Sequence, residues 1–193
     1  MPREDWKKNP VHMILRKNGL WPFADDDRKT VLDVACGLSL KSQYLPNAQI
    51  LGVDIHEPYL RAIDFKGKFM IAKCNVRFLD CMFLPESFDL VYALDIIEHL
   101  TKQESKELIR MCKSICRQAV VIETPNGYIP QDMDIQGFGA DHLQTHRCGW
   151  SVKELKELGF KCVVRDYMMS DVKRHTKQDV DPNIELIDGI YLK

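Results

Sequence analysis

Apolar runs that alternate with helical patterns constrain the fold of this chain more than any other feature of its sequence. Five runs are rich in β-branched residues and are apolar at most consecutive positions. Such runs are typical of parallel strands that helices cover on both faces. The pattern therefore predicts an α/β fold, with a doubly wound, mostly parallel sheet and helices on both faces. The five expected strands are Val31–Cys36, Gln49–Val53, Val76–Leu79, Phe88–Leu94 and Ala119–Glu123.

Two capping boxes mark helices in the second half of the chain. Thr101–Glu104 and Ser151–Glu154 each place a hydroxyl three residues before a glutamate, and Gly159 is expected to end the second helix. The strand-like runs Lys161–Tyr167 and Ile184–Leu192 follow without a helical pattern between them. We therefore expect these two runs to form a C-terminal antiparallel hairpin.

Length and composition are those of a single soluble domain. The chain has 193 residues, of which 45% are hydrophobic, and no apolar run approaches the roughly 20 residues of a membrane span. A net charge of -1 argues against a sequence-independent nucleic-acid binder. Seven cysteines without C-x-x-C spacing favour a reducing, cytoplasmic location. We divide the chain into a polar lead-in or cap (1–29) and one domain (30–193), and the sequence indicates no oligomeric state.

In open α/β sheets the ligand lies beyond the carboxyl ends of the strands, so the residues after each strand are the candidates for function. The turn after the first strand contains a single glycine, Gly37, and Leu40 occupies the position of the third glycine in a dinucleotide fingerprint. Asp33, just before the turn, would repel a pyrophosphate and suit a cationic ligand. An ordinary strand-to-helix turn is the alternative.

The next two strand ends carry acidic residues suited to a nucleoside. Asp54 lies 21 positions after Asp33 (54 minus 33), close to the spacing at which a carboxylate binds ribose hydroxyls. Asp80 and the adjacent backbone N–H of Cys81 could contact the edge of an adenine. The alternatives are a helix N-cap at Asp54 and a surface turn at Asp80.

The fourth strand end has the densest polar cluster, Asp95, Glu98 and His99. These residues, together with VLDVACG, GVDI and VVIETPNGY, resemble the class I S-adenosylmethionine-dependent methyltransferases over residues 31–193. The resemblance implies a seven-stranded sheet and S-adenosylmethionine as cofactor. The turn departs from the family's usual pattern, with Ala35 and Ser39 where glycines are common.

The resemblance also implies roles for individual residues. Asp33 and the backbone of 35–37 would hold the methionine end, Asp54 the ribose, and Asp80 with Cys81 the adenine. The cofactor-binding residues implied in this way are Asp33, Ala35, Cys36, Gly37, Asp54, Ile55, Asp80, Cys81, Leu94 and Asp95.

The acceptor is expected to bind against the segment from Thr124 to Trp150, whose proline, glycine and aspartate content predicts a long irregular loop. His99 is the candidate general base. The predicted reaction is an in-line methyl transfer to a small-molecule acceptor, without a metal. The candidate acceptor-binding residues are Asn126, Tyr128, His146 and Trp150.

Several alternatives are also consistent with the sequence. The chain could bind the cofactor without catalysis. Asp95, Glu98 and His99, with His142 or His146, could hold a metal, as in the similar metal-dependent methyltransferases that act on the 2′-hydroxyl of small RNA; the near-neutral charge does not favour RNA. A zinc site that includes Cys148 is less consistent with the loop. A nicotinamide-dependent oxidoreductase disagrees with Asp33 and with the missing third glycine.

Overall fold

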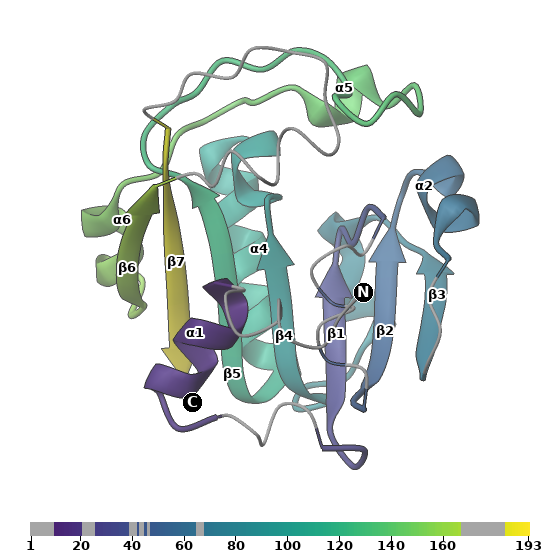
Figure 1. Cartoon of the computed structure of the whole chain (residues 1–193), viewed down its shortest axis with the longest axis vertical. Coiled ribbons are helices and arrows are strands. Elements are labelled where there is room, and N and C mark those ends of the chain that lie inside the picture. Colours follow the sequence, from purple (N-terminus) through teal and green to yellow (C-terminus); the bar gives the residue numbers. More distant parts are fainter. Residues whose placement is uncertain are drawn as a thin grey trace.

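A single seven-stranded sheet organises the computed structural model, which describes residues 10–20, 26–38, 42, 45, 47–64, 68–166 and 184–193 (Figure 1). The strands lie in the order β3-β2-β1-β4-β5-β7-β6, and all neighbours are parallel except at β7, which runs antiparallel to both β5 and β6. The predicted doubly wound sheet with a C-terminal hairpin is thus confirmed. The strands are β1 (Thr30–Val34), β2 (Gln49–Asp54), β3 (Phe69–Lys73), β4 (Phe88–Leu94), β5 (Cys116–Pro125), β6 (Lys161–Asp166) and β7 (Glu185–Leu192).

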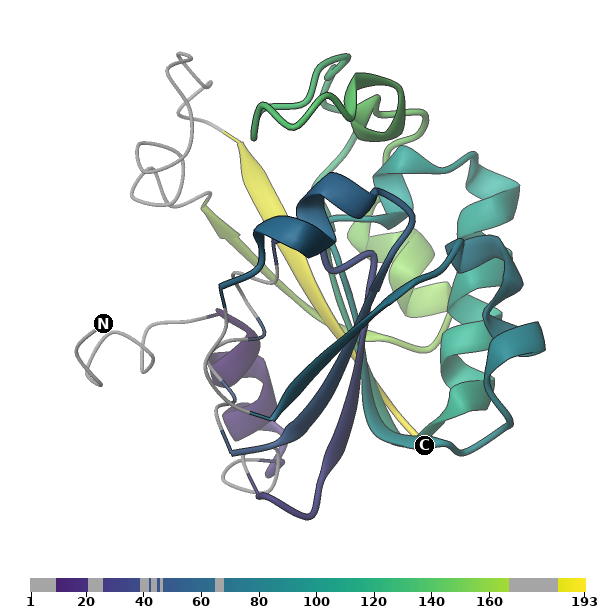
Figure 2. The same cartoon turned by 90° about the vertical axis from the view of Figure 1, so that its right-hand side faces the viewer.

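Helices cover both faces of the sheet (Figure 2). One face carries the larger core cluster, in which apolar residues of α4 and α6 pack against β4 and β5. The opposite face carries α1, whose Val11, Ile14 and Leu15 are buried against β4, β5 and β7. The helices are α1 (Pro10–Lys17), α2 (Glu57–Ala62), α3 (Leu79–Met82), α4 (Lys102–Ile115), α5 (Asp141–Gln144) and α6 (Val152–Glu157), with short 3-10 turns η4 (Val76–Phe78) and η5 (Ile97–His99).

The two predicted capping boxes are confirmed. Thr101 accepts a hydrogen bond from the backbone of Glu104 at the start of α4, and the Glu104 side chain accepts one from the backbone of Thr101. Ser151 and Glu154 repeat this exchange at α6, and Gly159 follows that helix at φ +84°. These reciprocal bonds satisfy backbone donors that would otherwise be left unpaired at a helix start.

The expected strand at Val76–Leu79 is wrong. Those residues form η4 and the start of α3, and the third strand lies earlier, at Phe69–Lys73. Val76 and Leu79 are both buried in the larger core cluster, because one turn of helix brings positions three apart to the same side. The error matters for function, since it moves the third strand end from Asp80 to Asn75.

The helical part of the lead-in belongs to the core rather than to a cap. α1 packs on the sheet face, and Figure 1 shows it beside β7, away from the ends of β1 and β4 that point toward α5. Residues 1–9 and 21–25 of the lead-in, and the predicted turn residues Ser39 and Leu40, lie outside the described residues. Among the helices that the structure describes, none has the length and apolar character to cross a membrane.

Candidate functional site

A cavity of about 260 Å³ opens at the carboxyl ends of β1, β2, β3 and β4. It lies where the strand order reverses between β1 and β4, which is the usual ligand position in open α/β sheets. The loop after β5, residues 126–150, forms the roof of the cavity and is called the roof loop below. The cavity is lined by Ala35, Gly37, Asp54, Ile55, Tyr59, Asn75, Val76, Arg77, Asp95, Ile96, His99, Leu100, His142, Leu143, Gln144 and Arg147.

The turn after β1 is held against the end of β2 by hydrogen bonds that its backbone N–H groups donate. The Cys36 N–H donates to the Val53 carbonyl (3.0 Å), and the Gly37 N–H donates to Oδ2 of Asp54 (2.9 Å). Ala35 and Gly37 both have left-handed backbone, with φ of +53° and +51°. The turn therefore brings small residues and main chain to the cavity wall, in the geometry expected of a loop that contacts a ligand through its backbone.

Asp54 is buried and fixed in orientation. Its Oδ1 accepts a hydrogen bond from the backbone N–H of His56 (2.7 Å), and its Oδ2 accepts the bond from Gly37. Burial raises the pKa of Asp54, and the bonds from His56 and Gly37 oppose that rise. Each carboxylate oxygen has a second lone pair, so Asp54 can still accept hydrogen bonds from a ligand in the cavity.

The other predicted residues of the first and fourth strand ends have different positions. Asp33 is buried on β1 beneath the turn, accepts a hydrogen bond from the Ser42 hydroxyl, and is not among the residues that line the cavity. Leu94 is also buried. Asp95 lines the cavity with φ +53°, and its N–H donates to the Glu123 carbonyl (2.9 Å).

At the third strand end the structure places Asn75, Val76 and Arg77 on the cavity wall. Asp80 and Cys81 lie beyond them, exposed on α3, where the Asp80 carboxylate is 3.4 Å from the Arg110 guanidinium. The Asn75 side chain accepts a hydrogen bond from the Arg77 backbone (3.1 Å). This Asn-x-Arg turn was visible in the sequence but was obscured by the misplaced strand.

The roof loop is anchored on α2 through a buried carboxylate. Asp134 accepts hydrogen bonds from the Tyr59 hydroxyl (2.6 Å) and from three backbone N–H groups of the loop, at 136, 138 and 140. The ring Nε2 of His56 lies 2.9 Å from the Phe138 carbonyl oxygen. Because the His56 backbone N–H also donates to the Asp54 carboxylate, the roof loop and Asp54 are both held by the same segment.

The two ends of the roof loop meet at its base. Bridges join Trp150 to Asn126 and Gly127, and the Gly127 N–H donates to the Trp150 carbonyl (2.7 Å). A Cβ at Gly149 would lie 2.6 Å from the Gly127 carbonyl carbon, so only glycine allows this close approach.

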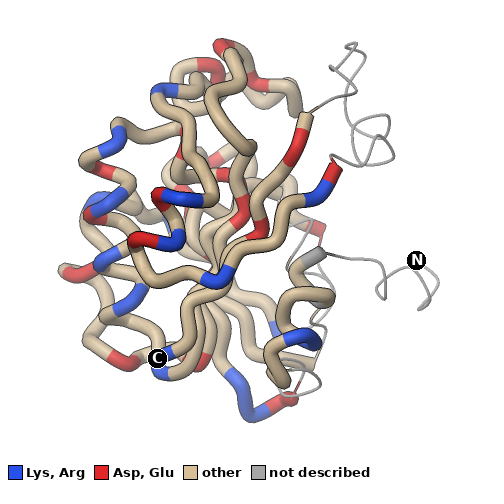
Figure 3. The backbone as a smooth tube through the Cα atoms, turned by 90° about the vertical axis from the view of Figure 1, so that its left-hand side faces the viewer, with Lys and Arg blue, Asp and Glu red and all other residues tan. Residues whose placement is uncertain are grey.

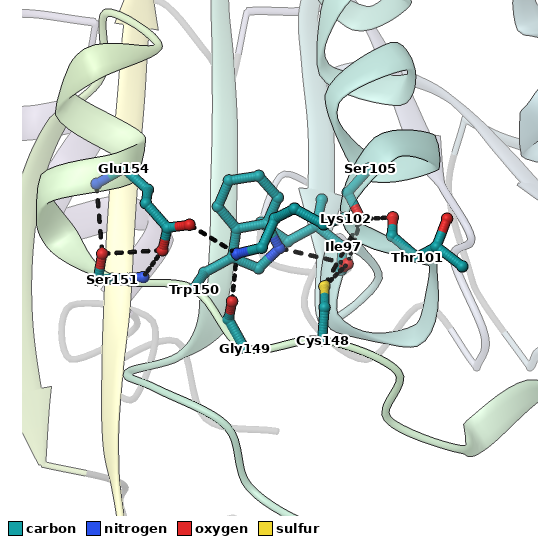
Figure 4. A network of polar contacts seen from close by, with 9 residues as sticks. All are labelled: Ile97, Thr101, Lys102, Ser105, Cys148, Gly149, Trp150, Ser151 and Glu154. Carbon is teal, nitrogen blue, oxygen red and sulfur yellow. Dashed lines mark hydrogen bonds and ion pairs between the residues drawn. The ribbon is translucent and has the colours of Figure 1, made fainter.

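A polar network ties the end of the roof loop to η5 and α4 (Figure 4). The Ile97 carbonyl accepts hydrogen bonds from Trp150 Nε1 (3.4 Å) and Ser105 Oγ (2.6 Å). The Lys102 ammonium lies 3.8 Å from the Trp150 ring centroid and 2.9 Å from Oε1 of Glu154. The segment that carries His146 is thereby fixed next to η5.

Glu98, His99 and His146 form a buried cluster, with one ligand atom of each within 4.8 Å of the others. Burial, and then the neighbouring His146, lowers the pKa of His99 to about 4, and burial lowers the pKa of His146. His146 Nδ1 lies 2.6 Å from the Ile129 carbonyl, so this nitrogen is the donor and Nε2 is the acceptor. Among the described residues, His99 Nδ1 has no hydrogen-bond partner.

The predicted acceptor residues are distributed over several environments. Trp150 is a core residue, exposed by only 1%. Asn126 donates to the Glu185 carboxylate (2.7 Å), and the exposed Tyr128 lies 3.4 Å from the His146 carbonyl. None of the four predicted acceptor residues is on the cavity wall, although His146 stacks edge-to-face on His99, with ring centroids 4.7 Å apart.

Sequence reasoning missed the roof side of the cavity. The missed lining residues include Tyr59, Leu143, Gln144 and Arg147. His142, which the sequence suggested as a metal ligand, also lines the cavity. Tyr59 lies on α2, after the second strand, and the other three missed residues lie in the loop after the fifth strand, where no periodicity marks individual residues.

The strand order, the reversed seventh strand and a cavity at the switch point define the class I methyltransferase fold. Residues 31–119 match the family model described as "Methyltransferase domain". The chain thus has the Rossmann-like fold of the class I S-adenosylmethionine-dependent methyltransferases. Comparison with curated protein sequences finds no match.

Solved structures of low sequence identity share the fold. A SAM-dependent methyltransferase from Archaeoglobus fulgidus has a TM-score of 0.60 at 20% identity, over 95% of this chain and 93% of that one. The methyltransferase domain of the bacterial protein CtHen1 has a TM-score of 0.59 at 16% identity, over 99% and 100%. The 1,6-didemethyltoxoflavin-N1-methyltransferase of Burkholderia thailandensis has a TM-score of 0.63 at 17% identity, over 99% and 81%.

Proposed function

We propose that this protein transfers a methyl group from S-adenosylmethionine to a small-molecule acceptor. The observation that carries the proposal is the junction of the β1 turn with Asp54, in which Gly37 and His56 orient a buried carboxylate toward the cavity. Two of the solved structures support it. The Burkholderia enzyme has bound S-adenosylhomocysteine, and a phosphoethanolamine N-methyltransferase from Haemonchus contortus is in complex with S-adenosylmethionine.

The lining residues suit a cationic nucleoside. Asp54 can accept the two ribose O–H groups, and the backbone at Ala35–Gly37 can approach the ligand closely. Asp95 adds an acidic group to the same wall, which favours a ligand with a sulfonium and an ammonium group. We assign the adenine-binding position to Asn75 and Val76, in place of Asp80 and Cys81, because only the former pair lines the cavity.

S-adenosylmethionine supplies an electrophilic methyl group on a sulfonium. The acceptor's nucleophilic atom forms a bond to the methyl carbon while the carbon–sulfur bond breaks, and that electron pair passes to sulfur. The roof loop excludes water, and the cavity wall aligns the two partners. His99 lines the cavity and is neutral near pH 7 because burial lowers its pKa, so its imidazole can accept a proton from the nucleophile.

Calorimetric titration with S-adenosylmethionine and S-adenosylhomocysteine tests the cofactor. We expect saturable binding by the wild-type chain and at least tenfold weaker binding by Asp54→Asn. Asp80→Asn is the matched control, and it should bind as the wild type does because Asp80 is exposed outside the cavity. Absence of binding by the wild type would contradict the proposed function.

Turnover separates an enzyme from a protein that only binds the cofactor. The wild-type chain is incubated with methyl-labelled S-adenosylmethionine and a fractionated small-metabolite extract, and label transfer is measured. Transfer into a low-molecular-weight fraction supports the proposal. Cofactor binding without label transfer into any fraction would support the non-catalytic alternative.

The cluster of Glu98, His99 and His146 supports a second candidate, a methyltransferase that uses a divalent cation. One carboxylate oxygen and two imidazole nitrogens are suitable ligands for a transition-metal ion. The bond between His146 Nδ1 and the Ile129 carbonyl fixes the ring orientation, as is usual for metal-binding histidines. When bound, such an ion would polarise a hydroxyl of the acceptor.

Titration with Mn²⁺ alone, after treatment with a chelator, distinguishes the second candidate from the first. If the cluster binds metal, His146→Asn should lose a saturable Mn²⁺ site that the control His142→Asn retains, because His142 is exposed and lies outside the cluster. Lack of saturable Mn²⁺ binding by the wild-type chain would reject the metal-dependent candidate.

A further inference from the structure

Arg147 lies on the roof side of the cavity, directly beside the candidate base. Its backbone N–H donates to the Glu98 carbonyl (2.8 Å), which fixes the residue against η5, and it lines the cavity together with His99. Burial, the adjacent His146 and the charge of Arg147 all contribute to the lowered pKa of His99. Arg147 and His99 therefore belong to one part of the cavity wall.

The Arg147 guanidinium has no carboxylate partner among the residues that the structure describes. Within the described part of the chain, its side chain makes one long contact, from Nη2 to the His142 carbonyl (3.4 Å). The other arginine of the cavity, Arg77, is neutralised by Glu104, with 2.8 Å between Nε and Oε1. A guanidinium presents a planar set of donors that matches a carboxylate or phosphate, so Arg147 offers an open anion site at the cavity.

We propose that Arg147 binds an anionic group, a carboxylate or a phosphate, of the small-molecule acceptor and thereby directs the acceptor's nucleophile toward His99. This inference rests on the proposed function and adds to it the chemical class of the acceptor. Arg147 is a specificity-determining residue in this arrangement. Its charge selects acidic acceptors over neutral ones, and its position sets the distance between the anionic group and the reacting atom.

The charges of the cavity wall favour the acceptor over the cofactor as the ligand of Arg147. The cofactor-facing walls after β2 and β4 carry Asp54 and Asp95, whereas Arg147 is on the roof loop after β5. The methionine carboxylate of the cofactor is the competing ligand, because it too is an anion. The experiment therefore measures cofactor affinity in the same variants.

The experiment uses benzoate and phenyl phosphate as anionic probes, with benzamide as their neutral match. Binding to the full chain is measured by calorimetry, with and without saturating S-adenosylhomocysteine. We expect at least one anion to bind at least tenfold more tightly than benzamide, and Arg147→Gln to remove that preference while S-adenosylhomocysteine affinity changes less than threefold. The tighter of the two anions identifies the group as carboxylate or phosphate.

Two control variants separate a binding role from a general change in charge or folding. Arg147→Lys should keep part of the preference, because it retains the charge but loses the planar donor set. Arg110→Gln removes the same charge from the exposed surface of α4 and should behave as the wild type.

Equal affinity for anions and benzamide, or a preference that persists in Arg147→Gln, would overturn the inference. A tenfold loss of S-adenosylhomocysteine affinity in Arg147→Gln would also overturn it, and would assign Arg147 to the cofactor instead. If S-adenosylhomocysteine fails to bind the wild type, the proposed function fails, and the titrations without it still decide whether Arg147 forms an anion site.

Discussion

Ala35 has a backbone conformation that glycine adopts more readily. Its φ of +53° lies in the left-handed region, which costs an L-residue roughly 1–2 kcal/mol. We expect Ala35→Gly to raise the free energy of unfolding by about 0.5–1 kcal/mol, since the extra entropy of glycine in the unfolded chain offsets part of the gain. Urea denaturation measures the change. Unchanged or lower stability would show that Ala35 is not strained.

His99 should make the fold sensitive to mild acid. At pH 7 the imidazole is neutral in the folded and unfolded chains, and it adds no pH dependence. Below pH 6.5 the unfolded chain takes up the proton first, and the folded chain follows only near pH 4. The free energy of unfolding should therefore fall, by on the order of 3 kcal/mol over this interval.

The comparison that isolates this effect is His99→Gln against the wild type, both with a chelator present, in urea at pH 7 and at pH 4.5. The variant should lose less stability between the two pH values, because its residue 99 cannot titrate. Equal losses in the two proteins would show that other groups account for the acid sensitivity.

At the scale of elements, the roof loop depends on its anchor at α2. Tyr59→Phe removes the hydroxyl that donates to buried Asp134 at 2.6 Å, and a hydrogen bond to a charged group contributes about 1.5–3 kcal/mol. We expect a loss of about 2 kcal/mol and faster proteolytic cleavage within 126–150. Tyr128→Phe is the control, since Tyr128 is 56% exposed. Similar cleavage rates in both variants would contradict the anchoring role.

The C-terminal hairpin is joined to β5 by an ionic triad of two buried carboxylates and the half-buried Arg165. Arg165 donates to Glu123 (2.6 Å) and to Asp188 (2.8 Å), which face each other across β5 and β7. Arg165→Met removes the cation between two buried carboxylates and should destabilise the fold by about 3–5 kcal/mol. Thermal or urea unfolding measures this loss, and Arg165→Lys should restore part of it. A loss below about 1 kcal/mol in Arg165→Met would refute the role of the triad.

At the scale of the whole molecule, the sheet was predictable because buried parallel strands are apolar at consecutive positions. β4 was predicted at its observed bounds, Phe88–Leu94. β3 was missed although its sequence, FMIAK, is apolar at four consecutive positions, because the third strand was expected later in the chain, at Val76–Leu79. In the structure, β3 is an edge strand whose residues are half-buried or exposed, so it is a strand that is not buried.

The candidate site was predictable on the sheet side and not on the roof side. Asp54 and Asp95 follow strands that the sequence locates, and both line the cavity. Arg147 lies in an irregular loop whose path is set by tertiary contacts, namely the Asp134 anchor and the bridges at Trp150. Local sequence pattern carries no information about such contacts, so the residues of the roof loop could not be predicted from it.

Figure 3 shows acidic and basic residues interspersed along the side drawn, in keeping with the net charge of -1.

The closed base of the roof loop has a consequence for how such proteins can diversify. Asn126, Gly127 and Trp150 bring the two ends of the loop together, and the family match ends earlier, at residue 119. Because these two ends lie together, we expect that the segment between them can be replaced without separating β5 from α6. Replacing this segment with the equivalent segment of a relative should change the acceptor preference, while the cavity residues at the ends of β1 to β4 stay the same.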